Sequence, residues 1–464
     1  MAFIAQHDTH LLQTTPLLAI LDPVLPHATV QGIVARYAPP GARCRKLPGE
    51  VGLALLIALS LVPMTAAESV LAFLLTGLRL RWPSLQPRVA SKSGISRARR
   101  RWGTRPIIAL FRTVCQPLAT PQDPGAFRFG LHVMAIDSTL EDLADTPANE
   151  QAFGRHHGSH GAAAFPAMLG IYLLECGTRA IWGAGFWPCH TSVHAGPAQR
   201  LLRALRPGML LLWDAGFHSY PLSALVRERG AHLLGRVPAG QTFVPERLLP
   251  DGSLLARFSA APPSRRTAAT PFLLVRVVTY TLVGAPKVYR LLTTLLDPAQ
   301  APALELILAY HERWEIETVI DELDTHLRLA PGPFRSPTPR GVLQEAYGLL
   351  LAHYAVRATM LAAARQAGCD PDRVSFVHTV RLLVPLLALA PLLTAAGLAQ
   401  ALSLLLADLV RPLLPAPAHR SNPRVVRRNR SKHRVRSTRT AAARTNLPPF
   451  REQIAITCPS GLSP

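Results

Sequence analysis

The chain has 464 residues, with 50 lysines and arginines against 28 acidic residues and a formal net charge of +22. This length is enough for two to four structural units, and the charge predicts a polyanionic partner, of which nucleic acid is the commonest. A ribosomal or membrane-surface protein would have a similar balance. The six cysteines are scattered without a Cys-x-x-Cys pair, which argues against a disulfide framework and a zinc site and suits a reducing compartment.

Residues 1–125 are predicted to be helical. The first eight residues lack the charged and then apolar profile of a signal peptide. A long apolar stretch at 51–78 is followed by a cluster of five arginines between residues 97 and 105. Helices with an arginine-rich edge suit a module that binds DNA ends, with Arg99 and Arg100 as candidate contacts. A helical cap whose arginines are solvated is the alternative.

Residues 126–237 alternate in the manner of an α/β layer. Four strands are expected, at 129–136, 167–175, 179–186 and 208–213. A crossover helix at 199–205 precedes the last of them. Asp137 is expected to end the first strand, and Asp214 the fourth, where Ala215-Gly216 signals a turn.

Roughly 100 residues separate Asp214 from Glu317, more than one short connection needs. The stretches 273–282 and 287–295 predict a β-rich segment between about 238 and 300. Glu317 then lies in a segment with helical periodicity, and another helix is expected at 340–364.

Two stretches imitate membrane spans, 51–78 and the uncharged 382–407. The second contains Pro385 and Pro391, and we interpret it as two short buried helices. The region 420–439 holds nine arginines or lysines and no acid, which predicts DNA binding with Arg427 and Arg428 as candidate contacts. An integral membrane protein with a basic cytoplasmic tail is the alternative from another class.

Three carboxylates occupy positions that suit a two-metal nuclease. Asp137 and Asp214 follow strands and Glu317 lies on a later helix, so that all three can converge on a pair of ions. Such a pair holds both the attacking and the leaving oxygen of a phosphodiester. Hard carboxylates favour Mg²⁺ or Mn²⁺. Taken alone, any one of these acids is more often a surface or capping residue.

The residues around these acids resemble the DDE transposases of insertion-sequence family four. The family signature is Tyr, two residues, Arg, three residues, Glu, six residues, Lys, and Tyr310, Arg313 and Glu317 have the right spacing. Ile136-Asp137-Ser-Thr139 and Trp213-Asp214-Ala-Gly-Phe217 are similar to the family as well. The resemblance extends from about residue 97 to 430.

The resemblance implies an α/β fold with an RNase H-like catalytic core and a β-strand insertion. Together with the patterns described above, it leads us to expect an N-terminal helical DNA-end-binding domain at 1–125, the catalytic domain at 126–360 with its insertion at 238–300, and C-terminal helices with a basic tail at 361–464. The implied activity is metal-dependent cutting and joining of the ends of an insertion sequence. The implied partners are double-stranded DNA, as terminal inverted repeats and as target, and a second protomer. The implied location is the cytoplasm, on the nucleoid, and no membrane is expected as a partner.

The resemblance also suggests roles for the side chains near Glu317. Arg313 would hold a phosphate, and Tyr310 would position the DNA backbone or pack. The family lysine falls at Asp324, where a carboxylate would repel DNA. At 100° per residue, one stripe of this helix is expected to carry Tyr310, Arg313, Glu317, Asp321, Asp324 and Arg328, with Arg328 supplying positive charge beside Asp324. Asp324 therefore motivates an alternative, a decayed or repurposed relative that binds DNA without cleavage.

Overall fold

The computed structural model describes residues 17–37, 47–62, 64, 66–81, 89–158, 161–267, 269–283, 285–328, 332–415 and 449–457. The basic stretch 420–439, with Arg427 and Arg428, lies outside these residues. The chain divides into two units, each made of separate segments. The first comprises Met1–Phe127, His132–Ala204 and Trp314–Pro415, and the second comprises Arg128–Leu131, Leu205–Arg313 and Ala416–Pro464.

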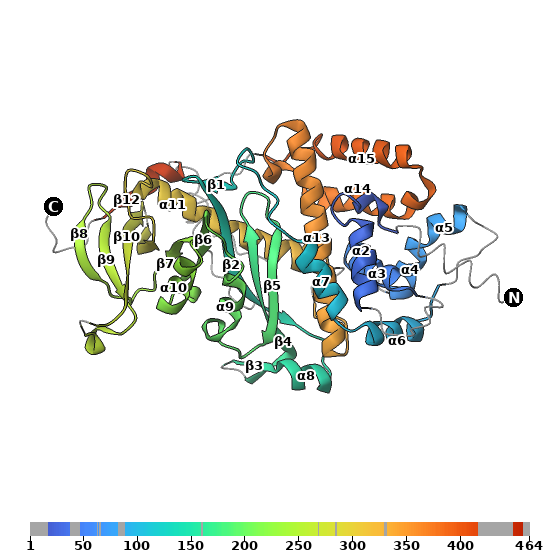
Figure 1. Ribbon diagram of the computed structural model, residues 1–464, viewed down its shortest axis with the longest axis horizontal. Coiled ribbons are helices and arrows are strands. Elements are labelled where there is room, and N and C mark those ends of the chain that lie inside the picture. Colours follow the sequence, from blue (N-terminus) through green and yellow to red (C-terminus); the bar gives the residue numbers. More distant parts are fainter. Residues whose placement is uncertain are drawn as a thin grey trace, which may run out of the picture. The chain divides into compact units, whose positions relative to one another are not determined.

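Several helices of the first unit pack around one long helix, α13 (Pro339–Ala367). They come from both ends of the chain, namely α3 (Gly49–Leu61), α7 (Arg105–Val114), α14 (Phe376–Leu389) and α15 (Ala395–Leu409) (Figure 1). Ten of the thirteen residues of α3 are buried, so it needs partners on every side. Gly348 lets α13 approach closely, because a Cβ there would lie 2.4 Å from the carbonyl oxygen of Leu56.

Four further α-helices lie in the described part of the N-terminal region, in agreement with the helical prediction. They are α2 (His27–Tyr37), α4 (Ala67–Leu74), α5 (Thr76–Arg81) and α6 (Lys92–Trp102). The Ser91 side chain caps α6 by accepting a hydrogen bond from the Gly94 amide, and Gly103 ends it with a positive φ of 65°. The cap and the glycine therefore fix both ends of the arginine-rich helix.

The sheet of the first unit is an antiparallel meander. β2 (Leu131–Asp142) pairs with β4 (Gly161–Glu175), and β4 pairs with both β5 (Ile181–Pro188) and β3 (Arg155–Gly158). The helices α8 (Pro147–Phe153) and α9 (Pro197–Leu202) lie between and after these strands in sequence. The predicted strands and crossover helix are thus present, with ends shifted by a few residues.

Asp137 lies inside β2 and not at its end, which corrects the sequence prediction. Pairing with β4 continues as far as Asp142 opposite Ala167. The prediction stopped at Asp137 because the apolar alternation stops there. The backbone ladder continues because it needs only amide and carbonyl groups.

The second unit contains a parallel pair of strands and the β-rich insertion. β6 (Met209–Trp213) is followed by α10 (Tyr220–Glu228) and the parallel β7 (His232–Arg236). From β7 the sheet continues through β11, β10, β9 and β8. These strands span Ala285–Thr293, Phe272–Leu282, Leu254–Ser259 and Val244–Leu248. The antiparallel β2, β4 and β5, then a helix, then parallel β6 and β7, form the order of the expected RNase H-like core.

The last described segment of the chain returns to the second unit. β12 (Ile454–Ile456) pairs antiparallel with β10, and Phe450 packs edge-on against His311 of α11 (Ala303–His311) at 3.8 Å between ring centroids. At the other expected boundary, residue 360 falls inside α13. The region 361–464 therefore contributes to both units.

The stretch 382–407 forms parts of two helices, α14 and α15, as predicted. Burial is uneven, because α15 buries Leu405 and Leu409 while Leu404 is 58% exposed. Within the described part of the chain, no helix is both long enough and apolar enough to cross a membrane.

The segment that carries the signature is not one continuous helix. After α11 come a 3₁₀ turn at Glu312–Trp314, then α12 (Glu315–Asp321), then a π-helical turn at Glu322–His326. The single stripe from Tyr310 to Arg328 assumed 100° per residue throughout, and both turns depart from that angle. The prediction of one stripe is therefore wrong.

Candidate active site

Asp137 is presented by β2 of the first unit. It lies opposite Tyr172 of β4, directly after the buried Ile136. Its side chain is half-buried, and its Oδ1 accepts a hydrogen bond of 2.8 Å from the amide of Ser138. The carboxylate is thus held at a fixed place on a rigid strand.

Glu317 belongs to the same unit and lies on α12. Ile316 and Val319 are fully buried and hold one face of this short helix against the core. Glu317 itself is half-buried. The expected helical placement of this carboxylate is therefore found, although the helix around it has only seven residues.

Asp214 lies in the second unit, directly after β6 as predicted. It begins the 3₁₀ turn Ala215–Phe217, and its Oδ1 accepts a hydrogen bond of 2.8 Å from the Gly216 amide. A Cβ at Gly216 would lie 3.0 Å from that oxygen, so a small residue suits this turn. The turn fixes one oxygen of the carboxylate.

Tyr310 and Arg313 lie in the same unit as Asp214. Burial raises the pKa of Tyr310 to about 12, with Asp214 adding to the rise while Arg313 and Arg236 oppose it. The Arg313 guanidinium carbon lies 6.0 Å from the centre of the Tyr310 ring. Tyr310, Arg313 and Asp214 therefore form one electrostatic group in the second unit.

The three acids are divided between the two units, Asp137 and Glu317 in the first and Asp214 in the second. Among the residues that the structure describes, no group of three or more His, Cys, Asp or Glu side chains is placed to hold a metal ion. The donors themselves are all carboxylate oxygens, which fit a hard cation such as Mg²⁺ or Mn²⁺ and not a softer metal.

Arg328, which the sequence predicts to offer its charge to DNA, has partners within the protein. Its Nη2 binds the buried carboxylate of Glu141 and lies 3.5 Å from Asp324 Oδ1. Its guanidinium carbon lies 4.0 Å from the centre of the Phe334 ring. The Arg328 guanidinium is thus in contact with two carboxylates and an aromatic ring.

Asp324 is held in the same group. Burial and, to a smaller extent, the neighbouring Glu141 raise its pKa to about 6 against the opposing effect of Arg328. Arg328 follows the π-helical turn that contains Asp324, so this pairing is made by the local fold and not along a continuous α-helix. Asp324 is therefore part of an internal ion-pair group.

The arginines of α6 differ in their surroundings, and Arg99, a predicted DNA contact, has partners within the protein. Arg99 donates hydrogen bonds of 3.0 to 3.1 Å to Gln344, Ser336 and the Gly341 carbonyl, so its cation ties α6 to the start of α13. Arg100 is exposed, as are Arg97 and Arg101. A run of arginines in sequence does not reveal which of them faces inward.

Two family models match the chain in the expected order. The model described as insertion element 4 transposase N-terminal matches residues 16–112, and the model described as transposase DDE domain matches residues 130–354. The chain belongs to the insertion-sequence-four family of DDE transposases. The DDE match of this transposase contains all three acids, and its N-terminal match contains α6.

Curated relatives agree with this assignment. The transposase InsG of insertion sequence IS4 from Escherichia coli K12 is 26% identical over 389 residues, which cover 83% of this chain and 85% of the relative. The putative transposase InsZ of the same strain is 24% identical over 52% of this chain and 77% of its own length. A cryo-EM structure of a piggyBac transposase synaptic complex with hairpin DNA matches 86% of both chains, with 13% identity and a TM-score of 0.47, too distant to add to the assignment.

Proposed function

We propose that this transposase is a Mg²⁺- or Mn²⁺-dependent nuclease and strand transferase that cuts and joins the ends of an insertion sequence. The observation that supports this most is the order of Asp137 on β2, Asp214 after β6 and Glu317 on α12 within the region that the DDE model matches. Asp137, Asp214 and Glu317 are the proposed catalytic metal ligands.

The side chains of the site would divide the work. The three carboxylates would hold two ions, which when bound lower the pKa of an attacking water and neutralise the departing 3′ oxygen. The planar guanidinium of Arg313 suits a phosphate oxygen pair. Tyr310, whose pKa is about 12, keeps its proton at neutral pH and can donate a hydrogen bond to the DNA backbone.

The proposed partners are double-stranded DNA, first the terminal inverted repeats and then the target, and a second protomer in the synaptic complex. The exposed arginines of α6, Arg100 among them, and the basic stretch with Arg427 and Arg428 would neutralise phosphates. The proposed place of action is the cytoplasm, on the nucleoid.

The test is strand cleavage by the purified full-length protein on DNA that carries the inverted repeats flanking its coding region. We expect nicks at the repeat ends with Mg²⁺ or Mn²⁺ and none with EDTA. Specific binding of the repeats without any nick, under conditions in which InsG cuts its own ends, would contradict the proposal and favour a relative that binds DNA without cleavage.

A further inference from the structure

A buried ion pair ties the C-terminal end of α12 to the long helix α13. Glu322, the first residue of the π-helical turn, is only 4% exposed. Its Oε2 accepts a hydrogen bond of 3.0 Å from Arg357 Nε and lies 3.0 Å from His353 Nε2, while Arg357 Nη2 binds its other oxygen. Burial alone would raise the pKa of Glu322, but Arg357 and His353 outweigh it and lower the pKa to about 2, so the pair is ionic.

A second buried carboxylate ties the other end of α12 to the turn between β4 and β5. Glu315 Oε2 accepts a hydrogen bond of 2.7 Å from the Gly177 amide, and its other oxygen lies 4.0 Å from Arg179 Nε. Arg179 Nη2 in turn lies 2.7 Å from Asp372 Oδ2. Arg179 has a φ of 58°, a left-handed conformation that a non-glycine residue keeps only where its surroundings hold it.

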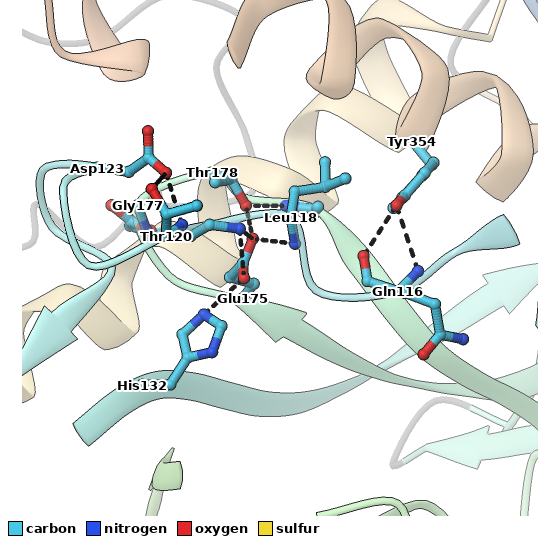
Figure 2. A network of polar contacts seen from close by, with 12 residues as sticks. Gln116, Leu118, Thr120, Asp123, His132, Glu175, Gly177, Thr178 and Tyr354 are labelled. Carbon is cyan, nitrogen blue, oxygen red and sulfur yellow. Dashed lines mark hydrogen bonds and ion pairs between the residues drawn. The ribbon is translucent and has the colours of Figure 1, made fainter. Parts of the chain in front are cut away.

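This turn is itself held by further contacts. Glu175, fully buried at the end of β4, accepts hydrogen bonds from the Leu118 and Ala119 amides at 3.0 Å and from the Thr178 hydroxyl (Figure 2). His132 Nε2 lies 2.6 Å from the same carboxylate. A Cβ at Gly177 would lie 2.6 Å from the Ala126 amide nitrogen, so the turn also packs tightly. It is a rigid anchor for α12.

Glu317 lies between these two anchors, two residues after Glu315 and five before Glu322. The helix between them has seven residues and is flanked by a 3₁₀ turn and a π turn, so regular backbone geometry alone does not fix its rotation. Apolar side chains would stabilise such buried positions at least as well as ion pairs do. Hydrogen bonds with fixed directions, from the Gly177 amide to Glu315 and from Arg357 to Glu322, however, define where the helix ends lie.

We propose that Glu315 and Glu322 are positioning residues that hold Glu317 in the orientation needed to bind a metal ion. This inference rests on the proposed function, because it assumes that Glu317 is a metal ligand. Neither residue touches the reacting atoms. Each acts through the backbone of α12, Glu315 from the β4–β5 turn and Glu322 from α13.

The experiment measures Mn²⁺ binding by the full-length protein without DNA, from the electron paramagnetic resonance signal of free Mn²⁺. Glu322→Gln removes one anchor. Arg179→Gly removes the guanidinium of the other anchor while glycine suits the φ of 58°, so this variant keeps the turn. We expect both to bind Mn²⁺ about tenfold more weakly than the wild type, the loss typical of residues that support metal ligands.

Asp251→Asn is the matched control. Asp251 pairs with Arg276, a fully buried arginine of the β-rich insertion, so the variant also leaves a buried cation without its carboxylate. It should lower the thermal midpoint and leave Mn²⁺ affinity unchanged. If Asp251→Asn loses as much Mn²⁺ affinity as Glu322→Gln does, the loss reflects general destabilisation of the fold, and the proposal is overturned.

The other outcomes also decide. Wild-type Mn²⁺ affinity in a folded Glu322→Gln or Arg179→Gly protein would overturn the proposal, and if Glu322→Gln does not fold, Arg179→Gly decides alone. The proposed function fails separately, when Glu317→Ala binds Mn²⁺ as the wild type does.

Discussion

Arg328, which follows the π-helical turn, lies with its Nη2 3.5 Å from Asp324 Oδ1 within that turn. The family pattern has a lysine at position 324. In this chain the cation at this place is Arg328, which lies between Asp324 and the buried Glu141. The residue that departs from the family pattern thus belongs to an ion-pair group inside the first unit.

Replacing Asp324 with Asn should remove a pH dependence of stability. The pKa of Asp324 is raised from 3.8 to about 6, mainly by burial, so its protonated form stabilises the fold below pH 4 and this contribution is lost as pH rises through 6. We expect Asp324→Asn to be more stable than the wild type at pH 7.5 by about 1 kcal/mol, a value reduced because the side chain is 40% exposed.

Urea unfolding at pH 4 and pH 7.5 measures this difference in stability, and an equal effect of Asp324→Asn at both pH values would contradict the prediction.

Asp324→Lys tests the other view of this position, in which residue 324 contacts a DNA phosphate. Because Glu141 would pair with the new lysine, we expect no gain in end binding or cleavage at low salt.

Removing any one of the three proposed metal ligands should abolish cleavage without loss of DNA binding. We expect Asp137→Ala, Asp214→Ala and Glu317→Ala each to lower the cleavage rate by about a thousandfold or more, because two ions need all three carboxylates. End binding should stay within about twofold, since phosphate contacts dominate affinity. Asp142→Ala, an exposed carboxylate of the same strand β2, is the control and should cut normally. Near wild-type cleavage by one of the three would remove that residue from the site.

Arg99 and Arg100 should behave differently although they are neighbours. Arg99→Ala should lower the free energy of unfolding by about 2 kcal/mol, because Gln344 and Ser336 lose a charged donor. Arg100→Ala should leave stability unchanged and weaken DNA binding, with a slightly smaller dependence of log affinity on log salt. Thermal melting and binding at several salt concentrations separate the two effects, and the reverse pattern would refute this assignment.

The basic stretch 420–439 should be tested by neutralisation and not by deletion of the C-terminus. Deletion to residue 464 would also remove β12, which pairs with β10, and Arg451, which lies 2.7 Å from Glu305. Replacing the nine arginines and lysines by glutamine should keep the melting temperature and reduce the salt dependence, by about 0.9 in slope for each phosphate no longer neutralised. An unchanged slope would show that this stretch does not contact DNA.

The elements that the sequence predicted well are those whose pattern depends on burial alone. β4 and β6 are apolar because they lie in the core, and the α13 pattern persists over 29 residues. Asp214 follows β6 as predicted for the same reason, whereas Asp137 was expected at the end of β2 and lies inside it.

The remaining features depend on partners far along the chain. The π turn begins at Glu322, whose partners His353 and Arg357 lie about 30 residues further on, and no local pattern signals it. Arg99 donates a hydrogen bond to Gln344, and Arg328 donates one to Glu141, and both acceptors are distant in sequence. A sequence can show that such side chains are charged, but the fold determines which of them are already paired.

The packing of α3 against α13 has a consequence for synthesis on the ribosome. α3 ends at Leu61 and its main partner ends at Ala367, roughly 300 residues later, so at about 5–20 residues per second α3 emerges on the order of 15–60 s before α13 is complete. During that interval the apolar faces of α3 have no native partner from α13. We therefore expect the nascent N-terminal region to bind a chaperone such as trigger factor until translation passes α13.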